Sequence, residues 1–145
     1  QQPWNLIVAW DEFAPGNKLA IDNSRKCLVI SIAFQELGQD RINSGLAWCT
    51  PAVIRTQTIK AVAGGMSNVL RTFLMHLMIG PAGLSTSGIP LEIGGRIVPL
   101  FARVGNLMSD GDGIRAGFDW RGHASIKPCL KHFNVLKKDR ALTGR

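Results

Sequence analysis

The chain has 145 residues, 46% of them hydrophobic and 19% charged, a composition typical of one globular domain with a single core. No run of about eighteen apolar residues occurs, so we expect no membrane-spanning helix and no membrane partner. The three cysteines, Cys27, Cys49 and Cys129, are odd in number and far apart, which favours a reducing intracellular compartment over a disulfide framework. The chain begins at Gln1 without a methionine, and we expect it to be a piece of a longer protein.

The excess positive charge lies at the C-terminal end. Residues 1–112 hold nine Lys and Arg against eight Asp and Glu, whereas residues 113–145 hold eight against two. A basic segment beside acidic residues suits a polyanion such as DNA, because Lys and Arg neutralise phosphates. A solvated basic tail is the alternative. The candidate nucleic-acid-binding residues are Arg115, Arg121, Lys127, Lys131, Lys137 and Lys138.

Three strands are expected in the first part of the chain. The continuous apolar run over residues 5–13 predicts a central strand covered on both faces. Residues 27–34 predict a second strand and residues 46–56 a third. Because Pro51 cannot donate a ladder hydrogen bond, the third strand belongs at a sheet edge or carries a bulge. Short connections favour an antiparallel meander with the first strand toward the sheet interior.

The hydrophobic period then changes. Residues 58–79 carry apolar side chains at three- and four-residue spacing, which predicts one long helix, weakened by Gly64-Gly65 and ended by Gly80-Pro81. Residues 89–93 and 96–101 flank a Gly-Gly pair, which predicts a hairpin with a two-residue turn.

The remaining elements surround an acid-rich turn. Residues 100–108 predict a strand, residues 114–120 about two helical turns, and residues 134–142 the start of a basic helix. We expect a single domain over residues 1–145 that is truncated at its C-terminal end, with residues 127–145 forming a basic loop or helical tail.

This order of elements is that of the RNase-H-like fold. The fold class is α/β with a mixed sheet: three antiparallel strands, a long helix, then a strand parallel to the first. In that arrangement the acids Asp11 and Asp110, each at the end of a strand, would be neighbours. Like charges so close repel unless they share a cation, and a ligand set of oxygens alone favours Mg²⁺ or Mn²⁺. The alternative is that these acids cap strand ends or bind helix amides.

Two motifs carry a resemblance to a known family. The segment WDEFAPGN, followed by SDGDGIRAGFDWRGHASIKPCLKH, resembles the catalytic region of eukaryotic DDE-type transposases. The chain is also similar, over nearly its whole length, to reading frames of mobile elements. The residues that match the family motifs are Asp11-Glu12-Phe13, Asp110, Gly113, Gly117-Phe118 and Pro128-Cys129.

The resemblance implies an RNase-H-like domain, divalent-metal phosphodiester chemistry, DNA as partner and a nuclear location. Asp11 would be the first catalytic acid and Asp110 the second, and Asp112 is the rival for the second role because strand register is open. All three are candidate metal ligands. Side-chain alternation along the strand directs Glu12 to the opposite face from Asp11, which makes Glu12 the weaker candidate.

Two departures from the family pattern matter. Ser109 stands where the family often has glycine. No convincing third acid precedes Arg145, because Asp139, in a Lys-Lys-Asp-Arg run, follows the second acid too soon. We therefore expect this fragment to be catalytically incompetent or very weak.

A second metal site is a weaker candidate. Cys129 and His132 have the two-residue gap of half a zinc site, and His123 is a candidate third ligand, which makes Zn²⁺ a second candidate cofactor. No fourth ligand is evident, and a partly buried cysteine near a surface histidine is the alternative.

The expected function is a fragment of a metal-dependent, transposase- or integrase-like enzyme that cleaves or joins DNA phosphodiesters. The first alternative is a non-catalytic nucleic-acid-binding or interaction module derived from a mobile element. The second is a structural domain of a larger protein in which the strand-end acids have no role.

Overall fold

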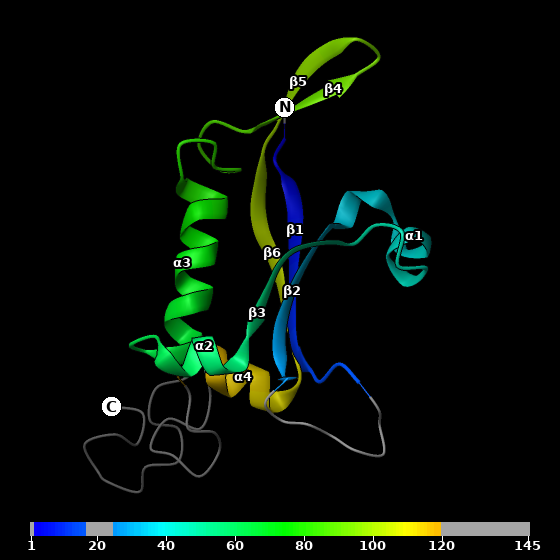
Figure 1. Ribbon diagram of the computed structural model, residues 1–145. Helices are drawn as coiled ribbons and strands as arrows, with labels where there is room; N and C mark the ends of the chain where they lie inside the picture. Colours follow the sequence, from blue (N-terminus) through cyan, green and yellow to red (C-terminus); the bar gives the residue numbers. More distant parts are fainter. Residues whose placement is uncertain (1, 17–24, 120–145) are drawn as a thin grey trace, which may run out of the picture.

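The structure, a computed structural model, describes residues 2–16 and 25–119 (Figure 1). The larger sheet comprises β1 (Trp4–Phe13), β2 (Cys27–Phe34), β3 (Cys49–Arg55) and β6 (Ala102–Met108). A separate hairpin comprises β4 (Ile89–Ile93) and β5 (Arg96–Leu100). The helices are the 3₁₀ helix η2 (Gln35–Leu37), α1 (Gln39–Asn43), α2 (Thr56–Ala61), α3 (Gly65–Ile79) and α4 (Gly111–Gly117).

The larger sheet is mixed, with the spatial order β3, β2, β1, β6. Strands β1, β2 and β3 form an antiparallel meander, whereas β6 pairs with β1 in parallel. The predicted interior place of the first strand is confirmed, and so is its parallel pairing with the strand that follows the helix. The edge position expected from Pro51 is also confirmed, since β3 is an edge strand.

The hydrophobic core lies between the sheet and α3 (Figure 1). Leu6, Val8 and Trp10 alternate along β1 and are buried on the α3 side, together with Leu28 and Ile30 of β2. This alternation follows from the two-residue period of a strand, which sends every second side chain to the same face. The functional residues at the end of β1 are therefore held by a strand whose preceding residues are fixed in the core.

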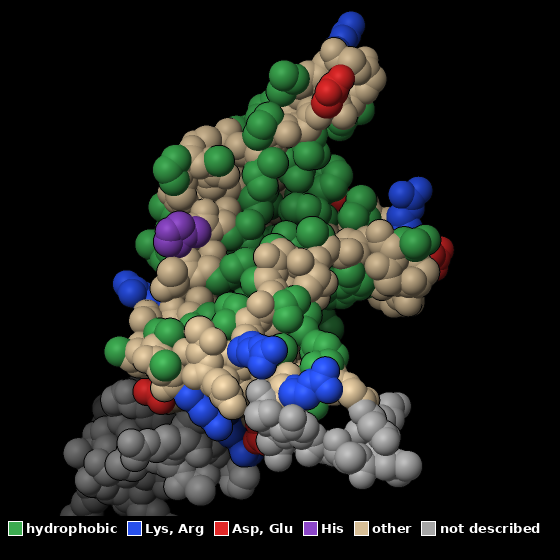
Figure 2. All heavy atoms as spheres, in the orientation of Figure 1, with side chains coloured by type: hydrophobic (Ala, Val, Ile, Leu, Met, Phe, Trp, Pro, Cys, Tyr) green, Lys and Arg blue, Asp and Glu red, His purple; other side chains and the backbone are tan. Residues whose placement is uncertain are grey.

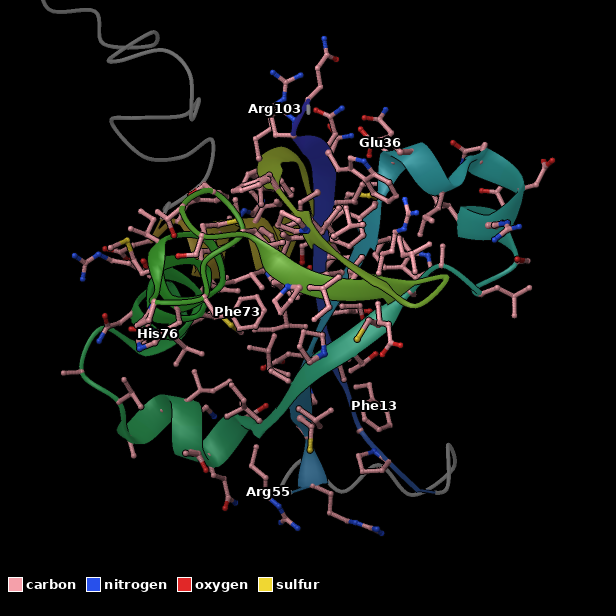
Figure 3. All side chains as sticks on the ribbon, turned by 90° about the horizontal axis from the view of Figure 1, so that it is seen from above. Phe13, Glu36, Arg55, Phe73, His76 and Arg103 are labelled. Carbon is pink, nitrogen blue, oxygen red and sulfur yellow. The ribbon has the colours of Figure 1, made fainter. Side chains whose placement is uncertain are left out.

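Polar contacts fix the opposite, N-terminal end of β1. The backbone N–H of Asn5 donates to the Glu36 carboxylate at 2.9 Å, and its side-chain oxygen accepts from Arg103 Nε at 2.9 Å. Figure 3 shows Glu36 and Arg103 on either side of β1. These bonds link β1 to the segment after β2 and to β6, so they help to fix the register of the parallel pair.

The single helix predicted over residues 58–79 is wrong in one respect, because two helices occupy this stretch. Helix α2 ends at Ala61 and α3 begins at Gly65. Gly64 and Gly65 have φ of 80° and 54°, in the left-handed region that a glycine enters without the steric cost of a β-carbon. The glycine pair therefore breaks the helix rather than merely weakening it.

Two further differences concern short helices. Helix α4 begins at Gly111, whereas a start at residue 114 was predicted, because the Asp110 carboxylate accepts from Gly113 N and caps the helix. Between β2 and β3 lies the five-residue helix α1, for which the sequence gives no signal because its side chains show no apolar stripe. No helix of the described part is long and apolar enough to span a membrane.

The β4–β5 hairpin forms as predicted and projects from the end of the molecule opposite α4 (Figure 1). Its turn residues Gly94 and Gly95 have φ of 57° and 76°, as a type I′ turn requires. Ile89 and Leu100 anchor its base in the core. The predicted helix over residues 134–142 and the basic tail over 127–145 lie outside the described residues.

Candidate functional site

The register of the parallel pair brings two predicted acids together. Ala9 of β1 is paired with Met108 of β6. Asp11, near the end of β1, and Asp110, which caps α4 directly after β6, each follow this last pair by two residues. Both acids line the same two hollows, one on each face of the sheet.

The hollow on the α3 side, which we call the strand-end pocket, has a volume of about 370 Å³. It lies between the end of β1, the start of β2 and the first turn of α4. Its lining is largely polar, with apolar contributions from Trp10, Leu28 and Met66. Its charged residues are Asp11, Glu12, Asp110, Asp112 and Lys26. Four acidic residues and one lysine thus contribute to the lining of this small hollow.

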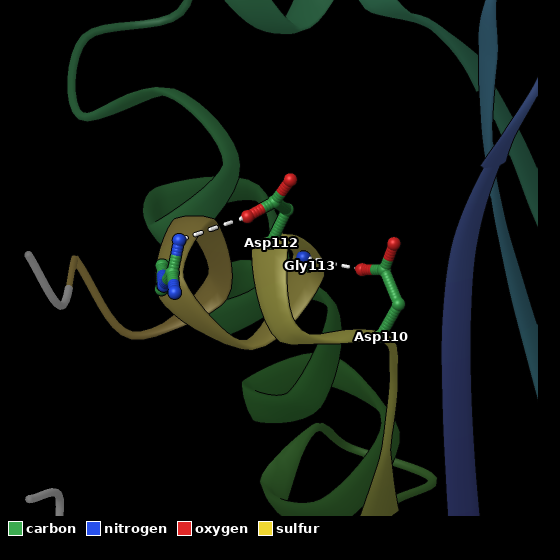
Figure 4. A network of polar contacts seen from close by, with 4 residues as sticks. Asp110, Asp112 and Gly113 are labelled. Carbon is green, nitrogen blue, oxygen red and sulfur yellow. Dashed lines mark hydrogen bonds and ion pairs between the residues drawn. The ribbon is translucent and has the colours of Figure 1, made fainter. Parts of the chain in front are cut away.

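Asp110 has a structural role in this pocket. Its Oδ1 accepts a hydrogen bond from the backbone N–H of Gly113 at 2.6 Å, which caps α4 (Figure 4). The other carboxylate oxygen has no hydrogen-bond partner among the described residues. The structure therefore supports the alternative that Asp110 binds a helix amide, and it also leaves one oxygen of the same side chain free for a ligand.

Asp112 is paired within its own helix. Its Oδ1 lies 3.1 Å from Nη1 of Arg115 (Figure 4), and the two side chains are 88% and 42% exposed. Such an exposed pair contributes little to stability, between about 0 and 1 kcal/mol. It does engage Arg115, which the sequence suggested as a phosphate contact, and it makes Asp112 the less available of the two rivals for the second acid.

Asp11 and Glu12 lie on opposite faces of β1, as strand alternation predicted. Glu12 is paired with Leu28, a core residue on the α3 side, whereas Asp11 is paired with Val29. The Glu12 carboxylate accepts from Thr56 Oγ1 at 3.1 Å. Glu12 therefore faces the strand-end pocket, whereas Asp11 lines it from the end of β1 and also lines the hollow on the opposite face of the sheet.

Residues that the sequence did not suggest hold the two strand ends together. Trp10 Nε1 donates to the Gly113 carbonyl oxygen at 3.0 Å, and Ser109 Oγ donates to the Trp10 carbonyl oxygen at 2.6 Å. Phe118 packs edge-to-face on Trp10, with ring centroids 6.2 Å apart. Ser109, which looked like a departure from a family pattern, thus links β6 to β1 beside the acids. An aspartate followed three residues later by a closely packed glycine was the available sign of the helix cap.

A second, larger cavity lies beside the site and carries no acid. This α3 groove, of about 420 Å³, is bounded by α3, by β1 and β6, and by the end of α4. Its lining is almost entirely apolar and includes Leu74, Met75, Met78, Ile79 and Phe118. Arg71 and Ser67 are its polar members. Its size exceeds that of the strand-end pocket, but the groups able to bind a cation are in the smaller hollow.

Other predicted site residues lie outside the described part of the chain. These are Arg121, His123, Lys127, Cys129, Lys131, His132, Lys137 and Lys138. Within residues 2–16 and 25–119, no three or more His, Cys, Asp or Glu side chains are grouped closely enough to form a ready metal cluster. No family model, curated protein or solved structure matches the chain.

Proposed function

We propose that this chain is part of a DNA-processing enzyme of the transposase or integrase kind, and that Asp11 and Asp110 bind Mg²⁺ or Mn²⁺ at the adjoining ends of β1 and β6, at the rim of the strand-end pocket that both residues line. The observation that carries the proposal is that both acids follow the last pair of the parallel strands, Ala9–Met108, by two residues and line the same two hollows. Two neighbouring carboxylates would repel each other, and a shared divalent cation removes that cost.

The sheet topology supports an RNase-H-like assignment within the mixed α/β class. The chain forms an antiparallel meander, crosses over through α2 and α3, and returns as β6 in parallel beside β1. The β4–β5 hairpin is then an insertion between the helix and the fourth strand of the sheet. This support comes from the order and direction of the strands. It does not depend on the handedness of the crossover, because either hand would place β6 beside β1.

The donor set suits a hard cation. Asp11 and the free oxygen of Asp110 would hold it, whereas Asp112, which is 88% exposed and paired through Oδ1 with Arg115, is the weaker candidate. Mg²⁺ commonly binds through one or two carboxylates and keeps several water ligands, so two protein acids are a sufficient start. When bound, such ions activate a water or a 3′-hydroxyl and stabilise the leaving oxygen of a phosphodiester.

The surrounding residues would position the acids and the substrate. The cap bond to Gly113 restrains Asp110, and the bonds of Trp10 and Ser109 restrain the two strand ends relative to each other. Lys26 lines the same pocket and forms no ion pair with the acids within the described residues. Its ammonium group is therefore available to a phosphate of the DNA backbone.

Metal binding tests this proposal directly, because weak catalysis is expected from a fragment without a third acid. Mn²⁺ would be titrated into the 145-residue chain and its Asp11→Asn and Asp110→Asn variants, with Asp40→Asn on α1 as a control of equal charge change. We expect each site variant to lower the affinity at least about tenfold and the control to leave it unchanged. Equal Mn²⁺ affinities for all four proteins would show that neither Asp11 nor Asp110 is a metal ligand.

A second candidate function is a nucleic-acid-binding module without catalysis. Asp110 caps α4 and Asp112 pairs with Arg115 of the same helix. Both acids therefore have a structural role that does not require a metal, which favours this candidate. DNA affinity would then fall steeply with salt, since phosphate contacts release counterions, and it would survive the loss of Asp11 and Asp110. Binding of DNA that instead requires Mn²⁺ and both acids would exclude this candidate.

A further inference from the structure

The distal part of the β4–β5 hairpin has no partner in the described structure. Every residue from Pro90 to Ile97 is exposed. Ile93 and Ile97 are 60% and 76% exposed, which is unusual for large aliphatic side chains on a strand. A two-stranded hairpin is marginally stable in water on its own, because it cannot bury an apolar face. These features together call for a binding partner.

Prolines exclude one kind of partner. Pro90 and Pro99 face each other across the two strands. In an antiparallel pair, residue pairs that exchange hydrogen bonds alternate with pairs whose N–H groups point outward. Because the turn is closed by the hydrogen-bonded pair Ile93–Arg96, the Pro90–Pro99 pair is one of those whose N–H groups would point outward. Both outer edges of the hairpin therefore lack a donor, which discourages strand addition at either edge. A partner must contact the side-chain faces.

The charge distribution excludes a second kind of partner. Residues 72–102 contain two charged side chains of the Asp, Glu, Lys and Arg types, Glu92 and Arg96, although the chain has a net charge of +7. Figure 2 shows this end of the molecule as mainly hydrophobic and uncharged, with one acidic and one basic side chain on the hairpin. A surface of this kind suits an apolar protein face rather than a nucleic acid backbone.

The α3 groove offers such a face. Arg71, Met75 and Ile79 follow one another at four-residue spacing and so form one stripe along α3 that lines the groove. Met75 and Ile79 are 46% and 56% exposed. The stripe ends at the C-terminus of α3, which lies at the end of the molecule from which the hairpin projects (Figure 1). Arg71 gives the N-terminal end of this stripe a positive charge. The hairpin face that carries Ile97 also carries the negatively charged Glu92, so the two surfaces are complementary in charge.

We propose that the chain forms a two-fold symmetric dimer in which the hairpin of each copy packs into the α3 groove of the other. Ile97 would cover Met75 and Ile79, and Glu92 would pair with Arg71 across the interface. Each copy carries both halves of the contact, and a two-fold axis lets both contacts form at once, so the assembly closes at two copies. The proposal is independent of the metal site.

Charge reversal provides a sharp test. Sedimentation equilibrium of the 145-residue chain would compare wild type, Glu92→Arg, Arg71→Glu, the double variant carrying both changes, and an equimolar mixture of the two single variants. We expect each single variant to dimerise at least about tenfold more weakly, because like charges then meet in both contacts. The double variant and the mixture should recover wild-type dimerisation, since opposite charges meet again in both contacts.

Matched controls separate this contact from general effects of charge and solubility. Lys60→Glu on α2 makes the same charge change as Arg71→Glu and should leave the dimer intact. Ile97→Asp should give a monomer, whereas Leu46→Asp, at a large apolar side chain that is 86% exposed after α1, should not. Circular dichroism would verify that each variant is folded.

Three results would overturn the proposal. The first is a wild-type chain that remains monomeric up to about 1 mM, the weak limit of specific association. The second is a dimer that neither Glu92→Arg nor Arg71→Glu weakens. The third is a mixture of the single variants that associates no better than either variant alone.

Discussion

The indole nitrogen of Trp10 donates a hydrogen bond to the carbonyl oxygen of Gly113, 3.0 Å away in space and 103 residues later in the chain. Ser109, which precedes Asp110, donates in turn to the carbonyl oxygen of Trp10, which precedes Asp11. One bond therefore joins the two residues that immediately precede the candidate acids, and the other ties Trp10 to α4 just beyond Asp110. The relative position of Asp11 and Asp110 is thus fixed by their neighbours and does not depend on a metal.

Trp10→Phe should weaken both the fold and the site. The substitution removes the indole donor and leaves the Gly113 carbonyl with its bond inside α4, so the free energy of unfolding should fall by about 0.5 to 1.5 kcal/mol. The matched control is Trp48→Phe, which removes a bond of the same kind to the Ile42 carbonyl near α1. Urea denaturation should show destabilisation in both variants, but Mn²⁺ titration should show weaker binding in Trp10→Phe alone. Equal loss of Mn²⁺ affinity in both would contradict a specific role for Trp10.

Two glycines of α4 should respond in opposite ways to alanine. A β-carbon at Gly113 would overlap the Ser109 hydroxyl, whereas a β-carbon at Gly111 would meet no atom within 4 Å. Gly113→Ala should therefore lower the free energy of unfolding by about 1 to 3 kcal/mol. Gly111→Ala should be neutral or stabilise by up to about 1 kcal/mol, because alanine favours a helix. Adding Ser109→Ala should recover part of the loss at Gly113; thermal unfolding of all four proteins checks the set.

The sheet could be predicted from the sequence because its strands are continuous apolar runs bounded by turn residues. Cys27–Phe34 has the predicted ends, and the order of elements led to the β1–β6 pair. The interruption at Gly64 was missed because the apolar spacing continues across it, and left-handed backbone leaves no trace in hydropathy.

The site was only half visible in the sequence. Asp11 and Asp110 could be paired because each ends a strand, and parallel neighbours share an edge. Lys26 enters the same pocket from the start of β2, a proximity that no local pattern encodes. The role of Ser109 depends on a bond to a residue 99 positions earlier, which is likewise a property of the folded chain.

Asp110 should show separable structural and ligand roles. Asparagine is as good a helix cap as aspartate, so Asp110→Asn should change the free energy of unfolding little, whereas Asp110→Ala should lower it by about 0.5 to 2 kcal/mol. Both variants should lose Mn²⁺ affinity, because both lack the negative charge. Urea denaturation and Mn²⁺ titration on the same samples test this. If the Asp110→Asn protein binds Mn²⁺ as tightly as wild type, then Asp110 caps α4 and does not bind the metal.

Glu12 decides whether the candidate metal site has a third acid ligand in the described part of the chain. Its carboxylate accepts from Thr56 and lies on the α3 face, opposite Asp11. Glu12→Gln keeps an acceptor for Thr56 and removes the charge, so Mn²⁺ affinity should change by less than about twofold, against at least about tenfold for Asp11→Asn. Thr56→Val, which removes the hydroxyl donor, should likewise leave Mn²⁺ affinity unchanged. If Glu12→Gln lowers the affinity as much as Asp11→Asn, then Glu12 turns toward the metal and supplies the carboxylate that otherwise has to come from elsewhere in the protein.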